Sequence, residues 1–238
     1  TLKGFLALSK KHNLIPVYRE ILADLETPVS CFLKLGGRPY SYLLESVEGG
    51  EKMARFSFIG ASSSQILKSV RGKDPLIKLE ETLKQYREAP VPGLPPFSGG
   101  AVGYLSYDTV RYIENIPDKN PDAYGIPESV FMISDTVLAF DHIRKKIKVV
   151  CNAFLDGKKD PEAVYAESVK KIENEISRLR APLASNDLAF EPHAGAKIDF
   201  KSNFTEAEFK KIVLRAKEHI KKGDIFQVVL SQSLKTPV

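Results

Sequence analysis

An acidic, a hydroxyl and a basic side chain lie close together in the sequence near residue 50. In residues 42–60, one expected strand ends at Glu45 and Ser46, a glycine-containing turn follows, and Arg55 enters the next strand. If these three groups converge at the strand ends, they suit a zwitterionic amino acid as ligand. The carboxylate of Glu45 can pair with the ammonium of the ligand, and the guanidinium of Arg55 can pair with the carboxylate of the ligand. The alternative is a surface salt bridge between Glu45 and Arg55 beside a turn serine.

Polar side chains also alternate with apolar ones near the end of the sequence. Residues 225–232 have the period of a strand, with Gln227 and Ser231 on one face among branched apolar residues. On a central strand these groups must hydrogen bond internally or face a polar cavity. The alternative is a partly exposed strand with solvated glutamines. Since the sequence stops soon afterwards, we expect this strand to begin a catalytic unit that is mostly absent.

The other reactive residue types form no recognisable catalytic or metal motif. None of the four histidines has metal-ligand spacing to another ligand, and no Gly-x-Ser-x-Gly motif is present. The glycine-spaced strand expected at 97–108 could cradle a phosphate, but glycine inside a strand more often permits close packing or a bulge. Cys31 and Cys151 lie far apart in expected strands, so buried, reduced thiols are predicted.

Length and composition are those of an ordinary globular protein. The 238 residues are 43% hydrophobic, with a mean hydropathy of -0.18, which allows one large core or two modest ones. The net charge of +5 comes from lysines interspersed with acids, a pattern that argues against a nucleic-acid site. No run approaches the roughly 18 apolar residues of a membrane span, and no signal peptide is recognisable, so the predicted compartment is the cytoplasm.

Strand signals adjoin one another more often than helices intervene, which predicts an antiparallel α+β fold rather than a doubly wound parallel sheet. Turn, cap and periodicity signals place the elements. They predict a helix at 4–12, a hairpin of strands 29–35 and 40–46, strands at 54–59 and 64–70, a helix from Asp74-Pro75, a proline-rich surface loop at 89–96, a hairpin of strands 131–140 and 147–154, a helix from Asp160-Pro161, and a helix from the capping box Thr205 to Glu208. Residues 181–203 lack periodicity and are the expected linker, which places a boundary near residue 200.

Four motifs in one order give the chain a resemblance to a known family. They are Leu43-Leu-Glu-Ser46, Arg55-Phe-Ser-Phe-Ile-Gly60, residues 98–108 and residues 223–232. Over essentially all 238 residues, the chain resembles the N-terminal half of anthranilate synthase component I, the chorismate-using large subunit of tryptophan synthesis. The aminodeoxychorismate synthase subunit of folate synthesis is a related family. It shares the glycine-rich strand, whereas the full run from Leu43 to Lys52 is similar to the anthranilate branch.

The resemblance implies a fold of antiparallel sheets packed face to face with helices outside. It assigns residues 1–200 to the N-terminal regulatory region and residues 201–238 to the start of the chorismate-binding catalytic domain. The family's magnesium-binding glutamates, catalytic histidine and Pro-Tyr-Met tryptophan contacts would follow residue 238. This implies that the fragment has no metal ligands of its own and is inactive alone.

The implied activity is that of a lyase. Ammonia adds to C2 of chorismate, the C4 hydroxyl leaves, and pyruvate is eliminated to give anthranilate, with Mg²⁺ holding the substrate carboxylate. A glutamine amidotransferase subunit supplies the ammonia, and L-tryptophan binds the N-terminal region as a feedback inhibitor. Glu45 and Ser46 match the family's tryptophan-contacting motif, and Arg55 matches a basic position there.

Gln227 stands where similar isochorismate-forming and salicylate-forming enzymes have a lysine that activates water. A neutral amide cannot take a proton from water, whereas ammonia is already a nucleophile. Gln227 therefore fits the wall of an aminating active site. The anthranilate and aminodeoxychorismate alternatives both stay open on this point, and a free-standing tryptophan-binding regulatory module is a third alternative.

Overall fold

The computed structural model describes residues 1–35, 39–45, 55–119, 122, 124–183 and 199–236. The chain divides into two compact units, Thr1–Leu188 and Ala189–Val238. Every ladder between described strands is antiparallel, and helices accompany the sheets. The predicted antiparallel α+β class is therefore confirmed. The assignment of residues 1–200 to regulation and of residues 201–238 to catalysis stays a prediction.

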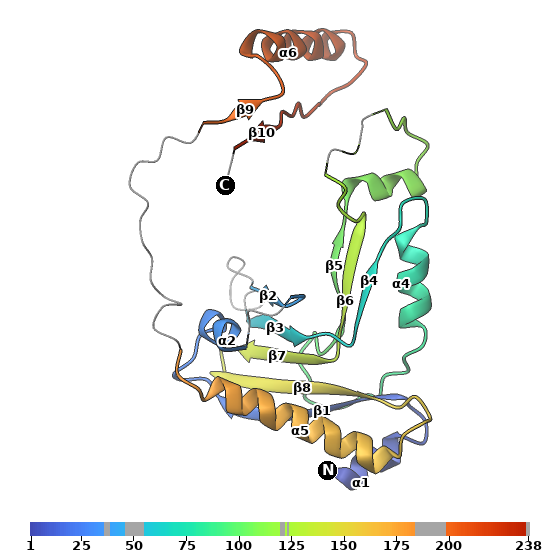
Figure 1. The fold of residues 1–238 in the computed structure, drawn as a ribbon, viewed down its shortest axis with the longest axis vertical. Coiled ribbons are helices and arrows are strands. Elements are labelled where there is room, and N and C mark those ends of the chain that lie inside the picture. The colour runs from blue at the N-terminus through green and yellow to red at the C-terminus, as the bar shows by residue number, and fades with distance from the viewer. Residues whose placement is uncertain (36–38, 46–54, 120–121, 123, 184–198, 237–238) are drawn as a thin grey trace. The chain divides into compact units, whose positions relative to one another are not determined.

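The larger sheet of the first unit has the strand order β1-β8-β7-β3-β2 (Figure 1). Its strands are β1 (Leu14–Leu22), β2 (Tyr42–Leu44), β3 (Phe56–Ser62), β7 (Thr136–Asp141) and β8 (Lys146–Phe154). The central strand β7 is buried at five successive positions. Because neighbouring side chains of a strand point to opposite faces, both faces of the sheet are covered at its centre.

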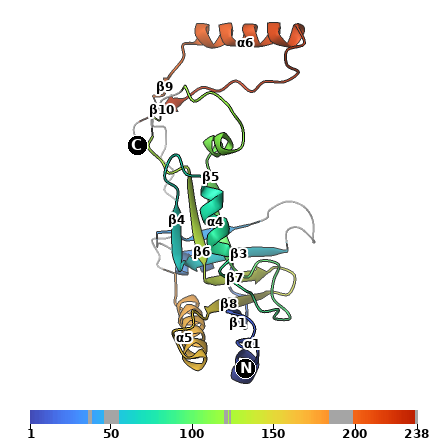
Figure 2. The ribbon, with the colours of Figure 1, turned by 90° about the vertical axis from the view of Figure 1, so that its right-hand side faces the viewer.

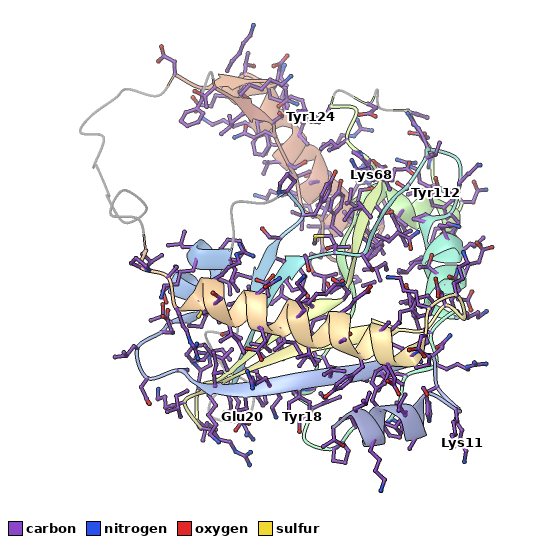
Figure 3. The ribbon with its side chains drawn as sticks, turned by 60° about the horizontal axis from the view of Figure 1, so that its bottom comes forward. Lys11, Tyr18, Glu20, Lys68, Tyr112 and Tyr124 are labelled. Atoms are coloured by element: carbon purple, nitrogen blue, oxygen red, sulfur yellow. The ribbon has the colours of Figure 1, made fainter. Side chains whose placement is uncertain are left out.

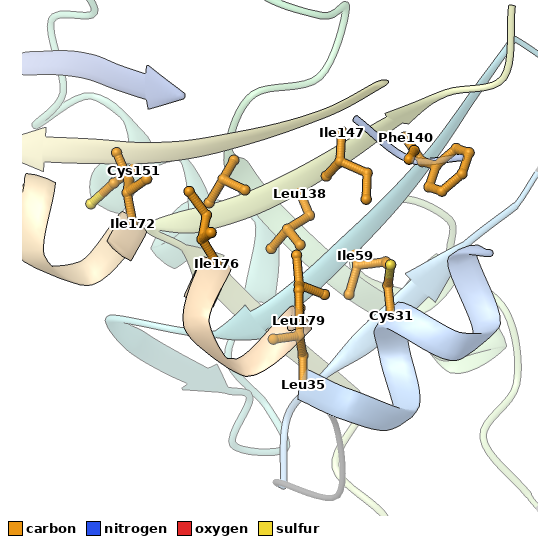
Figure 4. Packing of buried hydrophobic residues seen from close by; sticks show 12 residues of the cluster. Cys31, Leu35, Ile59, Leu138, Phe140, Ile147, Cys151, Ile172, Ile176 and Leu179 are labelled. Carbon is orange, nitrogen blue, oxygen red and sulfur yellow. The ribbon is translucent and has the colours of Figure 1, made fainter. Parts of the chain in front are cut away.

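Helices cover one face of this sheet. They are α1 (Leu2–Leu8), α2 (Pro28–Leu35) and α5 (Pro161–Leu179). In α5, the buried Ile172, Ile176 and Leu179 recur at helical spacing and pack with Leu138 and Cys151 of the sheet (Figure 4). The prediction of a helix from Asp160-Pro161 is confirmed.

The proline-rich loop and the two residues that follow it, Phe97 and Ser98, cover the other face. Tyr18 donates its hydroxyl hydrogen to the carbonyl of Pro92 (3.3 Å), and Asn152 donates from Nδ2 to the carbonyl of Ser98 (2.7 Å). The ring of Phe97 meets that of Phe58 edge to face at 5.4 Å. The loop expected at 89–96, with Phe97 and Ser98, thus lies over a sheet face that would otherwise expose the rings of Tyr18 and Phe58.

A second sheet has the order β4-β6-β5 and runs across the strand direction of the first (Figure 1). It consists of β4 (Gln65–Lys68), β5 (Gly100–Leu105) and β6 (Ser129–Ser134), with α4 (Pro75–Leu83) beside it and the 3-10 helix η1 (Tyr107–Tyr112) after β5 (Figure 2). Asp74 caps α4 by accepting from the backbone N–H of Leu76 (2.9 Å), and Pro75 occupies the first turn. The predicted start of this helix is confirmed.

The strand expected at 131–140 is wrong in one respect: it is two strands that belong to different sheets. β6 ends at Ser134, β7 begins at Thr136, and Asp135 lies between them. The backbone carbonyl of Asp135 accepts from the N–H of Asn152 (2.7 Å), and its carboxylate accepts from Ser62 Oγ (3.2 Å) and Lys171 Nζ (2.9 Å). These contacts hold the bend, so we call Ser134 and Asp135 the sheet elbow.

Residues 29–35 are helical, so the predicted strand and its hairpin with residues 40–46 are wrong. Thr27 and Ser30 exchange hydrogen bonds between side chain and backbone N–H (2.9 and 3.0 Å) at the start of α2. This cap, with Pro28 in the first turn, outweighs the strand preference of the following residues. Cys31 therefore lies in a helix, and the predicted burial of Cys31 and Cys151 as free thiols is confirmed.

The predicted hairpin between β7 and β8 is confirmed, and Asp141 organises its turn. Oδ1 of Asp141 accepts from the backbone N–H of Ile143 (3.1 Å) and Arg144 (3.0 Å), and Oδ2 accepts from Arg55 Nη2 (2.7 Å). Burial disfavours the charged carboxylate, but the hydrogen bonds from Arg55 and the turn outweigh it and lower the pKa of Asp141. The ionised form is therefore part of the folded state.

The second unit contains α6 (Glu206–Lys221) and a short ladder of β9 (Lys201–Ser202) with β10 (Leu234–Lys235). The predicted capping box of Thr205 and Glu208 is confirmed. The strand predicted at 225–232 is wrong, because these residues belong to no ladder, and Phe226 is 93% exposed. The backbone N–H and C=O groups of a strand need hydrogen-bond partners on an adjacent strand. In the described part of this unit, only β9 and β10 pair.

Gly103 on β5 provides a test of the second sheet. A Cβ added there would lie 1.9 Å from the carbonyl oxygen of Val130 and 2.7 Å from Cα of Phe131, both backbone atoms of β6. We expect Gly103→Ala to lower the free energy of unfolding by roughly 2 to 3 kcal/mol in urea denaturation, because the strands must separate. Gly4→Ala in α1, where the added Cβ meets only Thr1 Oγ1 at 3.4 Å, is the control. It should be neutral or stabilising, and equal losses in both variants would contradict the packing described.

Asp141 should also set part of the acid stability. Its pKa is lower folded than unfolded, so its stabilising contribution is present above the unfolded value, about 3.9, and is lost as pH falls through the folded value. Urea unfolding at several pH values should show the gap in stability between the wild type and Asp141→Asn shrinking below about pH 4. Arg55→Gln, which leaves the backbone hydrogen bonds of Asp141 in place, should give an intermediate profile. If the free energies of unfolding of the wild type and Asp141→Asn change with pH in parallel, the ionisation of Asp141 does not contribute to acid stability.

Candidate functional site

The expected amino-acid site lies at one end of the β2–β3 pair. Leu44 pairs with Phe58 in the ladder, so Glu45, directly after β2, and Arg55, directly before β3, lie at the same end. The side chain of Glu45 is exposed. Ser46 falls outside the described residues. The structure thus brings two of the three predicted residues to one sheet end.

Arg55 pairs with a carboxylate, and the partner is Asp141 rather than Glu45. Nη2 of Arg55 donates to Oδ2 of Asp141 (2.7 Å), and Nε lies 3.3 Å from both carboxylate oxygens. The guanidinium also lies 4.8 Å from the ring centroid of Phe56. The hydrogen bond to Asp141 raises the pKa of Arg55. A bound carboxylate would therefore meet a guanidinium that is already fixed in place.

Arg55 lines a cavity of about 330 Å³ under the proline-rich loop, which we call the Arg55 cavity. Its lining includes Glu20 of β1, labelled in Figure 3, with Lys146 and Lys148 of β8. Glu20 binds Lys146 Nζ at 2.5 Å and Lys148 Nζ at 3.6 Å, and the hydrogen bond from Lys146 lowers the pKa of Glu20.

The lining of this cavity combines basic and apolar side chains. Four basic side chains line it against two carboxylates; the basic residues are Arg55, Arg144, Lys146 and Lys148. Phe56, Leu94 and two prolines supply the apolar surface. The combination suits a small molecule with a carboxylate and an apolar body.

The sequence alone does not identify Asp141 as the partner of Arg55. The two residues are 86 positions apart and meet because β3 and β7 pair with Phe56 opposite Asp141. An aspartate at the start of an expected hairpin turn was the available signal. The identity of the strand beside it cannot be obtained from local patterns.

Gln227 lies in the second unit, outside any helix or strand, and its side chain is exposed. Its neighbours Phe226 and Val229 are 93% and 83% exposed. The structure therefore describes no cavity wall at Gln227, and the role assigned to this residue stays a prediction.

The described part of the chain has neither a metal-binding cluster nor a membrane-spanning helix. Within it, no group of three or more His, Cys, Asp or Glu side chains is placed to hold a metal ion. No helix there is both long and apolar enough to cross a membrane.

Comparison with known proteins gives consistent results. The chorismate binding enzyme family matches residues 39–238. Anthranilate synthase component 1 of Acetivibrio thermocellus is 37% identical over 250 residues, which cover 98% of this chain and 51% of that protein. Probable anthranilate synthase component 1 of Schizosaccharomyces pombe is 41% identical over 237 residues, which cover 98% of this chain and 48% of that protein.

A solved structure agrees with these relatives. Anthranilate synthase component I from Streptococcus pneumoniae TIGR4 superposes with a TM-score of 0.62 and 28% identity, over 92% of this chain and 49% of that one. The chain spans about half the length of the curated relatives it matches. The family match includes Glu45, Arg55 and Gln227, and the resemblance seen in the four motifs is confirmed. The chain belongs to the chorismate binding enzyme family.

Proposed function

We propose that this chain is the N-terminal part of an anthranilate synthase large subunit, a cytoplasmic lyase of tryptophan synthesis. The observation that supports this most strongly is the identity of 37% and 41% to component 1 proteins across 98% of the chain. The similar fold of a solved component I supports it as well. Because about half of the relatives' length is present, we expect residues 1–238 alone to be inactive.

In the proposed reaction, ammonia adds to C2 of chorismate and the C4 hydroxyl leaves as water. Elimination of pyruvate then aromatises the ring and leaves anthranilate. Gln227 is proposed for the wall of that site: its amide can hydrogen bond but cannot deprotonate water, and ammonia needs no such activation. A glutamine amidotransferase subunit is proposed as the ammonia source, and the name component 1 supports the existence of a partner.

Magnesium is proposed for the complete enzyme but not for this chain. The described residues contain no cluster that fits a divalent cation, so we assign no step of the reaction to a metal held here. The ligands implied by the resemblance would follow residue 238. What these residues contribute is the regulatory site.

Tryptophan is proposed to bind at Glu45, Ser46 and Arg55. Support comes from the position of Glu45 and Arg55 at one sheet end and from the Arg55 cavity, which joins basic side chains to an apolar wall. The carboxylate of the inhibitor would meet Arg55, and its ammonium would meet Glu45. Inhibition from this site requires a coupling free energy between it and the active site, typically about 1 to 3 kcal/mol.

The reaction is tested with the full-length protein. Chorismate, ammonium and Mg²⁺ should give the fluorescent product anthranilate, followed by its emission and identified by mass. Residues 1–238 alone, under the same conditions, should give none. Formation of aminodeoxychorismate would identify the protein as the aminodeoxychorismate synthase subunit of folate synthesis instead. Unchanged chorismate in the presence of the full-length protein would overturn the proposal.

The regulatory site is tested with Ser46→Phe in the full-length protein. The larger side chain should fill the inhibitor site and raise the tryptophan concentration for half-inhibition about tenfold or more, while chorismate turnover stays near wild type. Ser177→Phe, at an exposed position of α5, is the matched control and should be inhibited like wild type. Unchanged inhibition of Ser46→Phe would remove Ser46 from the site.

A further inference from the structure

A second and larger cavity lies between α4 and α5, beside the sheet elbow. Its volume is about 600 Å³, within the range of roughly 300 to 1,000 Å³ of small-molecule sites. Ser134 and Asp135 line it from the elbow, and Val164, Ser168 and Lys171 line it from α5. It shares no lining residue with the Arg55 cavity. We call it the elbow cavity.

Charged residues of the elbow cavity are mostly acidic. Four carboxylates and two ammonium groups line it: Glu88, Asp135, Asp156, Glu167, Lys159 and Lys171. Each lysine already has a carboxylate partner, since Lys159 Nζ lies 2.9 Å from both oxygens of Glu167 and Lys171 Nζ lies 2.9 Å from Oδ2 of Asp135. Within the described residues, Glu88 and Asp156 have no salt bridge. The lining thus carries excess negative charge, which attracts cations and repels anions.

Of these carboxylates, Asp135 is the best placed to bind the ammonium of a ligand. Its side chain is only 17% exposed, whereas that of its partner Lys171 is 53% exposed. Burial opposes the charge on Lys171, but the hydrogen bond to Asp135 prevails and raises the pKa of Lys171. A half-exposed lysine can return to water, so the ammonium of a ligand can replace Lys171 on Asp135 without leaving a buried charge unpaired.

Next to the acidic groups the cavity has an apolar and aromatic wall. The rings of Tyr86 and Phe154 meet edge to face, with centroids 5.0 Å apart and planes at 70°. Leu83, Ala153 and Val164 extend this wall. Aromatic faces attract cations as well as apolar groups, so the wall can receive the body of a ligand whose charged end is an ammonium.

We propose that the elbow cavity binds a small primary amine with an apolar or aromatic body. Its ammonium binds Asp135 in place of Lys171, and its body lies against Tyr86, Phe154 and Val164. This site does not depend on the proposed chorismate reaction, because the negative lining disfavours the anions chorismate and pyruvate. A ligand there would contact the elbow, and through it both sheets.

Three probes with one ring and different charge test the chemistry. Benzylamine, benzyl alcohol and benzoate are titrated into the full-length protein by calorimetry, and amide shifts on α5 locate the site by NMR. Benzylamine should bind saturably at 1:1, benzyl alcohol about tenfold more weakly, and benzoate not at all. Equal or tighter binding of benzoate, or no saturable binding of benzylamine, overturns the proposal.

Substitutions of opposite sign localise the site. Lys171→Gln removes the competing cation and should tighten benzylamine binding about threefold to tenfold, whereas Glu167→Gln should weaken it by a similar factor. Asp135→Asn should weaken benzylamine binding most. Because Asp135 also holds the sheet elbow, the thermal unfolding of this variant is measured in the same experiment to show that it is folded. Lys170→Gln, at an exposed neighbouring position of α5, is the control and should change nothing. Weaker binding in Lys171→Gln, or an equal effect of Lys170→Gln, contradicts the site.

Discussion

The contacts of Asp135 are the constraint on which the first unit depends. One residue between β6 and β7 hydrogen bonds to Ser62 of β3, to Lys171 of α5 and, through its carbonyl, to Asn152 of β8. Nearby, the hydroxyl of Tyr42 on β2 donates to Ser134 (2.9 Å). These bonds tie the bend between two sheets to strands and a helix from distant parts of the chain. Because buried polar groups must be paired, the bend has little freedom to move.

Local signals predicted the elements that local chemistry determines. The starts of α4 and α6 depend on a capping side chain, and α5 starts at Asp160-Pro161 with its proline in the first turn. The β7–β8 hairpin depends on the turn at Asp141, so a short stretch of sequence suffices to predict each of these elements. The composition of residues 29–35 predicts a strand, although the residues that form the helix cap, Thr27 and Ser30, are also visible in the sequence. The elbow was missed since residues 131–140 are apolar on both sides of the break, and only tertiary contacts of Asp135 separate the strands.

The sequence predicted where two of the candidate residues lie, but not which side chain pairs with Arg55. The spacing of Glu45 and Arg55 predicts that they lie at one sheet end, as observed. Asp141 reaches Arg55 through the pairing of β3 with β7, two strands far apart in sequence. Gln227 illustrates the opposite limit. The alternation of residues 225–232 predicts a strand, but it shows only which side chains would share a face and not which strand would pair with it. The ladder also needs neighbouring strands, and the described residues of the second unit pair only β9 with β10.

The proposed function requires the full-length protein to aminate chorismate at C2 and to release pyruvate. The most direct measurement is to supply the full-length protein with ¹⁵N-ammonium and chorismate, locate the label in the product by NMR, and measure pyruvate in the same sample. We expect ¹⁵N bound to the carbon next to the ring carboxylate and one pyruvate for each anthranilate formed. Label at C4 with the enolpyruvyl group retained would contradict it.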